Sequence, residues 1–168
     1  MEDAVRARAR ERSLRQQATE EATLGGALVD LAEEKAEIMV RMRSGRVAQG
    51  RVVVVGTDFV VLRSSAGGDT VLALGAVSGI RRRPGERPPD TTGRRRPPRP
   101  ATLAAYIASV APERPRVALT LAGEPGTLAG ELRSAGLDVL TVLLDGNPPV
   151  TAYLAVDSLE SLSVSPPG

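Results

Sequence analysis

Hydrophobic and polar positions along this chain fall into two successive blocks of the same layout. Each block opens with apolar residues at the spacing of one helical face, behind a threonine that can cap the helix, Thr23 or Thr102. The first face consists of Leu24, Leu28, Leu31 and Ala32, and the second consists of Leu103, Ile107, Val110 and Ala111. The pattern predicts one short helix at the start of each block.

Five short strands are predicted to follow each helix. The first strand alternates apolar and polar residues, at 38–42 and again at 117–121. A longer apolar run comes next, broken at Gly56 in one block and at Gly136 in the other, and two more short strands follow a polar turn. Strands so closely linked favour antiparallel hairpins, and closing them removes exposed strand edges. We therefore predict a mainly β fold of two small antiparallel barrels, each preceded by a short α-helix.

The two blocks align as an internal duplication. Residues 22–38 lie over 101–117 with an offset of 79, residues 50–62 over 130–142 with an offset of 80, and residues 71–80 over 153–162 with an offset of 82. The 40 aligned positions hold 10 identities, and the offset grows only at turns. A copy of about 60 residues buries too little surface to be more than marginally stable by itself. We expect the copies to pack on each other or on copies from another chain.

The composition divides the chain into five segments. They are a charged helical arm at 1–21, a first repeat at 22–80, an Arg/Pro-rich disordered linker at 81–100, a second repeat at 101–164 and a tail at 165–168. The linker holds eight arginines against two acidic residues, a net charge of +6, whereas the whole chain is only +2. The repeats and the arm together are therefore mildly acidic.

The residue types that are missing exclude several kinds of chemistry. The chain has no cysteine and no histidine, which removes thiol nucleophiles, disulfides, imidazole bases and the usual zinc ligands. We expect no enzymatic activity, no cofactor and no metal.

The absence of a signal peptide and of a long apolar run predicts a cytoplasmic protein without a membrane partner. Abundant Ala, Gly, Val, Pro and Arg are typical of a GC-rich bacterial genome, which supplies arginine without a functional reason.

A short motif crosses the second and third predicted strands of both copies. It reads G-x-[VL]-x-x-x-G-x-D-[FV]-[VL]-x-[LV], at 50–62 and 130–142. With the order of one helix and five strands, it resembles the Sm-like fold of the Sm, LSm and Hfq RNA-binding proteins, over residues 22–80 and 101–164. A generic SH3-like barrel would show nearly the same strands. The resemblance implies RNA binding and sheets that extend across subunits through edge strands, here 71–80 and 153–162.

The chain departs from that family at the positions that bind a base. Sm proteins place an aspartate and an asparagine between strands two and three, but here Asp58 and Asp138 are displaced toward the strand and the asparagine is missing. These two aspartates are expected to satisfy local backbone donors. The chain also looks like short actinobacterial proteins labelled Fis-family transcriptional regulators. Fis proteins end in a helix-turn-helix, and nothing after residue 112 resembles one.

The linker carries the candidate functional residues. Two arginine triplets are predicted to contact nucleic-acid phosphates: Arg81, Arg82, Arg83, Arg94, Arg95 and Arg96. The alternative interpretation is a solvated spacer whose arginines reflect codon usage.

Two function hypotheses therefore stand. The first is a non-enzymatic, regulatory nucleic-acid-binding protein, with RNA favoured over DNA. The second is a structural or adaptor protein that binds protein partners or assembles through its edge strands. Under either hypothesis we expect a homo-oligomer or a pair of barrels within one chain, and the N-terminal arm is a candidate surface for a protein partner.

Overall fold

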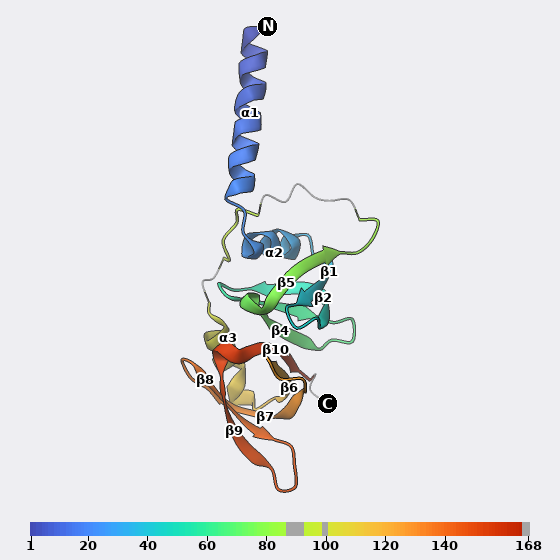
Figure 1. The fold of residues 1–168 in the computed structure, drawn as a ribbon, viewed down its shortest axis with the longest axis vertical. Helices are drawn as coiled ribbons and strands as arrows, with labels where there is room; N and C mark the ends of the chain where they lie inside the picture. The colour runs from blue at the N-terminus through green and yellow to red at the C-terminus, as the bar shows by residue number, and fades with distance from the viewer. Residues whose placement is uncertain (87–92, 99–100, 166–168) are drawn as a thin grey trace.

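The computed structural model describes residues 1–86, 93–98 and 101–165. The chain begins with helix α1 (Glu2–Glu20), which points away from the rest of the molecule and buries none of its residues (Figure 1). None of the helices in the described ranges is both long and apolar enough to cross a membrane.

Each repeat folds into a helix followed by five strands. The first repeat holds α2 (Leu24–Glu33), β1 (Glu37–Met42), β2 (Val47–Val55), β3 (Phe59–Arg63), β4 (Asp69–Ala73), the 3-10 turn η1 (Leu74–Ala76) and β5 (Val77–Arg82). The second holds α3 (Leu103–Val110), η2 (Ala111–Glu113), β6 (Arg116–Leu121), β7 (Leu128–Ala135), β8 (Val139–Leu144), β9 (Val150–Ala155), η3 (Val156–Ser158) and β10 (Leu159–Val164). The prediction of a mainly β fold with one short helix before each group of strands is confirmed.

Threonine side chains start both helices as predicted. The Thr23 hydroxyl accepts a hydrogen bond from the Gly26 amide at 2.9 Å, and the Thr102 hydroxyl accepts one from the Ala105 amide at 3.2 Å. Each bond satisfies an amide that has no partner inside its own helix. The periodicity and the caps were therefore enough to place these two elements.

All ten strands form one antiparallel sheet that does not close, in the order β5-β1-β2-β3-β4-β10-β6-β7-β8-β9. The repeats meet where β4 pairs with β10, from Ser161 opposite Leu72 to Val164 opposite Asp69. Within its own repeat, β4 pairs only with β3 and β10 pairs only with β6. The amide and carbonyl groups along the other edge of each strand are therefore available to hydrogen-bond between the repeats. The expected edge segments, 71–80 and 153–162, contain only part of this pair, namely Val71, Leu72, Ser161 and Leu162. The predicted arrangement of two barrels is not confirmed, because one unclosed sheet runs through both repeats.

The cores of the two repeats are joined through the same place. One apolar cluster belongs to the first repeat, around Leu28, Val40 and Leu62. The other belongs to the second repeat, but it includes Phe59 and Val71 from the first. The expectation that the copies pack on each other is therefore confirmed within a single chain.

Candidate functional site

Three of the six predicted phosphate-contact residues belong to β5 or its end. Arg81 and Arg82 lie inside β5, and Arg83 follows it. A terminal nitrogen of Arg82 lies 2.8 Å from a carboxylate oxygen of Glu34, and one of Arg83 lies 2.9 Å from that of Glu37. The predicted linker therefore begins later than residue 81, and its first arginines are held by the repeat.

The second triplet is paired in the same way. Arg94 binds Glu21 at 2.8 Å, and Arg95 contacts both Glu33 and, at 3.5 Å, Asp30. Four of the six arginines thus face carboxylates of their own chain, while Arg81 and Arg96 have no such partner within the described residues. Exposed ion pairs are weak, about 0–1 kcal/mol each. Their effect is to balance the linker charge locally against the acidic repeat.

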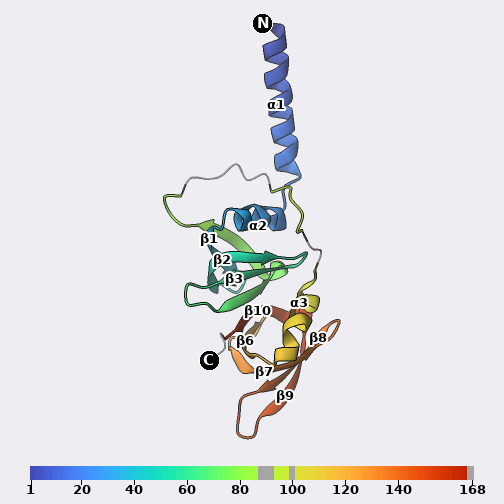
Figure 2. The same cartoon turned by 180° about the vertical axis from the view of Figure 1, so that it is seen from behind.

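Residues 93–96, called the strap below, dock on α2 through the backbone. The Gly93 amide donates to the Asp30 carboxylate at 2.9 Å, and the Thr23 amide donates to the Gly93 carbonyl at 3.0 Å. Gly93 has a left-handed φ of +63°, and a Cβ on Gly26 would lie 1.8 Å from the Gly93 carbonyl oxygen. Figure 2 shows this segment running beside α2. Composition predicts a disordered linker here, but the described strap is fixed; residues 87–92 and 99–100 lie outside the described residues.

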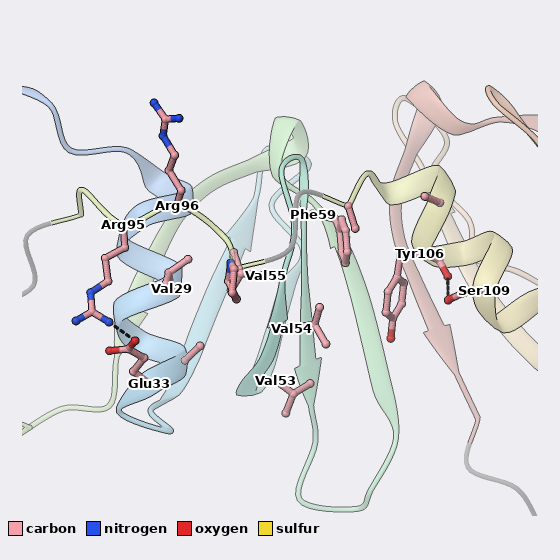
Figure 3. Close-up of a pocket in the computed structure, with 14 residues that line it drawn as sticks. Val29, Glu33, Val53, Val54, Val55, Phe59, Arg95, Arg96, Tyr106 and Ser109 are labelled. Atoms are coloured by element: carbon pink, nitrogen blue, oxygen red, sulfur yellow. Dashed lines mark hydrogen bonds and ion pairs between the residues drawn. The ribbon is translucent and has the colours of Figure 1, made fainter.

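A cavity of about 890 Å³ lies between α2, β2 and α3, with the strap at its rim (Figure 3). Its walls are mainly apolar, with Val53, Val54 and Val55 on β2. Phe59 and Tyr106 lie beside it, with ring centroids 5.0 Å apart. Burial raises the pKa of the Tyr106 hydroxyl above its usual value, and the nearby Asp69 carboxylate adds to this. The lining offers no convergent pair of acid and base groups among the described residues.

The joint between the repeats is reinforced by polar contacts that the sequence did not reveal. Arg46 reaches from the first repeat to the Pro125 carbonyl at 2.9 Å and to the buried Glu160 carboxylate at 3.5 Å. Thr70 on β4 and Ser163 on β10 share a hydrogen bond of 3.1 Å. No signal marked Arg46 and Glu160, because Arg46 lies in a turn between the aligned segments and the position aligned with Glu160 holds Ser78.

Asp58, which is equivalent to Asp138 of the second repeat, has a structural role. The Asp58 carboxylate accepts a hydrogen bond from the Leu103 amide at 2.7 Å, which caps the N-terminus of α3 together with Thr102. The Thr57 amide beside it donates to the Ala101 carbonyl at 2.9 Å. Asp58 therefore belongs to the joint between the repeats: it satisfies a backbone donor of the other repeat, whereas a local donor was expected.

The two ends of the sheet remain without a strand partner in the described part of the chain. These ends are β5 and β9. Strand β9 reads VTAYLA, without a charge or a proline, and Tyr153 is 74% exposed. Natural sheets usually protect such edges with charges, prolines or a covering element. Strand β9 therefore forms a six-residue sheet edge that has none of these protective residues in the strand itself.

Comparison with known proteins gave no relative: no family model, no curated protein and no solved structure matches the chain.

Proposed function

We propose that this protein is a non-enzymatic structural or adaptor protein that binds other polypeptides by strand addition at its uncovered sheet edges. Each repeat is proposed to be a small barrel of the Sm-like or SH3-like kind, with one edge strand used inside the chain and one left open. The observation that carries the proposal is the apolar, unprotected β9.

The internal joint supports strand addition as the way in which these repeats interact. Strands β4 and β10 come from segments far apart in sequence, yet they pair over Asp69–Leu72. Val71 and Leu162 lie opposite each other in this pairing, and both are buried in the apolar cluster that includes residues of both repeats. A repeat that already binds its neighbour by its edge has the chemistry to bind a further chain by the same means.

Nucleic-acid binding is the second candidate function. It rests on Arg81 and Arg96, which face no carboxylate among the described residues, and on the weak pairing of the other four arginines. Phosphate contacts by these side chains would compete with the acidic groups of α2 and β1. The scarcity of aromatic residues leaves few platforms for stacking bases.

One pair of measurements separates the two functions. Analytical ultracentrifugation over a range of protein concentrations should show association, and the variant Tyr153→Lys should weaken it, because a charge at the centre of β9 opposes strand pairing. RNA and DNA binding should be measured in parallel over a salt series. A chain that stays monomeric, and binds RNA with a log–log salt slope that flattens when both triplets become glutamine, would reverse the proposal.

A further inference from the structure

The internal joint is the pairing of one edge strand from each repeat. Because the chain is duplicated, each of these two strands has a counterpart in the other repeat, and neither counterpart has a partner at its outer edge in the described residues. The joint uses β4 of the first repeat and β10 of the second. By the offset of 82 residues, β4 corresponds to β9 and β10 corresponds to β5. These two corresponding strands are the two free ends of the sheet.

Side chains at corresponding positions are buried at the joint and exposed at the free edges. Val71 on β4 is 1% exposed, whereas its counterpart Tyr153 on β9 is 74% exposed. Leu162 on β10 is fully buried, whereas its counterpart Ile80 on β5 is partly exposed. The free edges thus carry apolar side chains at the positions where the joint requires them.

A second part of the joint is repeated in the same way. In the joint, Asp58 caps α3 at Leu103, which is 3% exposed. The counterparts are Asp138, in the turn before β8, and Leu24, the first residue of α2, which is 40% exposed. The residue before Asp138, Leu137, is 98% exposed. Two separate contact regions of the joint therefore have open counterparts on the same molecule.

We infer that β9 of one chain pairs antiparallel with β5 of a second copy, and that Asp138 of the first chain caps α2 of the second. This inference rests on the proposed function and names its partner. The internal register carries over directly: Leu154 lies opposite Gly79, Tyr153 opposite Ile80, Ala152 opposite Arg81 and Thr151 opposite Arg82.

The contact is head-to-tail, because the two surfaces that meet are different. Such heterologous contacts build a closed ring if the rotation between copies closes, and an open filament if it does not. The Arg46–Glu160 contact makes the internal joint different from the joint between copies, since the counterpart of Glu160 is Ser78, which has no carboxylate. A joint between copies therefore lacks this ion pair, and it is the one that separates on dilution.

Engineered cysteines test the register, because the natural chain has none. The single variants Arg81→Cys and Ala152→Cys are mixed and oxidised, and a disulfide-linked dimer should form in the mixture. Each variant oxidised alone should give little dimer. The double variant Thr70→Cys/Ser163→Cys, at the internal pair whose hydroxyl oxygens are 3.1 Å apart, should close within one chain and serves as the positive control.

A register control uses Arg81→Cys mixed with Tyr153→Cys, whose side chains lie on opposite faces of the paired strands. This mixture should cross-link much less than the first. Asp138→Ala should weaken association about fivefold, the effect of losing one helix cap, without changing the unfolding of the dilute protein. Equal cross-linking in both mixtures, or none with an intact positive control, would overturn the inferred register. If the wild type still associates in that case, the proposed function stands without the inferred register. A wild type that is monomeric at all concentrations would contradict both the proposed function and the inferred pairing.

Discussion

Gly26 is the residue on which docking of the strap depends most directly. The variant Gly26→Ala places a methyl group 1.8 Å from the Gly93 carbonyl oxygen, so the strap must move away. Asp30 then loses its amide donor in a buried position, which costs about 1–3 kcal/mol. We expect a lower free energy of unfolding and faster tryptic cleavage after Arg94 and Arg95.

The neighbouring glycine provides a matched control. A Cβ on Gly25 would meet no atom closer than 3.9 Å. Gly25→Ala should therefore stabilise α2 by about 0.5–1 kcal/mol through helix propensity alone and leave tryptic cleavage unchanged. If both variants behave alike, the strap is not held in the way described.

Tyr106 gives the stability of the protein a pH dependence. Its pKa is raised in the folded state by burial, so its neutral form stabilises the fold fully below the unfolded-state pKa of about 10. That contribution is lost as the pH rises toward the folded-state pKa. Thermal unfolding between pH 8 and 11 should show a smaller loss of stability for Tyr106→Phe than for the wild type. Tyr153→Phe, at an exposed position, should follow the wild type.

The roles of single residues were the least predictable from sequence. The sequence predicts that Asp58 satisfies local backbone donors, because it follows a glycine break. Its actual donor, the Leu103 amide, lies 45 residues away in the chain. The partners of Arg82 and Arg94 were not foreseen either, because a composition count cannot show which acidic residues the fold brings beside the linker.

At the scale of elements, Phe59 connects the two repeats. It lies at the start of β3, fully buried, in the core of the second repeat and in contact with Tyr106 of α3. Phe59→Ala should cost about 3–5 kcal/mol, and because the core is shared, both repeats should unfold together. Far-UV circular dichroism during urea unfolding measures this as a single, shifted transition.

The corresponding residue of the second repeat is the control. Val139 is 36% exposed at the start of β8, so Val139→Ala in the dilute protein should change stability by less than about 1 kcal/mol. Two separate unfolding transitions in the Phe59→Ala variant, or equal destabilisation by both changes, would contradict a core shared across β3 and α3.

Helices and strands were predictable because their periodicity is local. The faces at Leu24 and Leu103 and the breaks at Gly56 and Gly136 needed only neighbouring residues. The joining of both repeats into one unclosed sheet was not predictable to the same degree. Backbone pairing between β4 and β10 depends on which edges the fold leaves open, and that information is not in the alternation of residues.

At the scale of the whole molecule, the duplication produces one sheet whose two end strands, β5 and β9, each have one edge without a strand partner among the described residues. α1 and the β8–β9 hairpin lie at opposite ends of the long axis (Figure 1). The excess charge of the linker is partly balanced by Glu21, Glu33, Glu34 and Glu37, so four of the six arginines in the two triplets lie beside carboxylates. These features favour a partner that is a polypeptide over one that is a polyphosphate.

Hydrogen–deuterium exchange at two protein concentrations tests the central claim most directly. If the sheet edges bind strands of other copies, amides of 150–155 and 77–82 should exchange more slowly at high concentration, because new backbone hydrogen bonds protect them. The amides of α1, which contacts nothing in the joint, should exchange at the same rate at both concentrations. Exchange in β9 and β5 that is rapid and independent of concentration would contradict the claim.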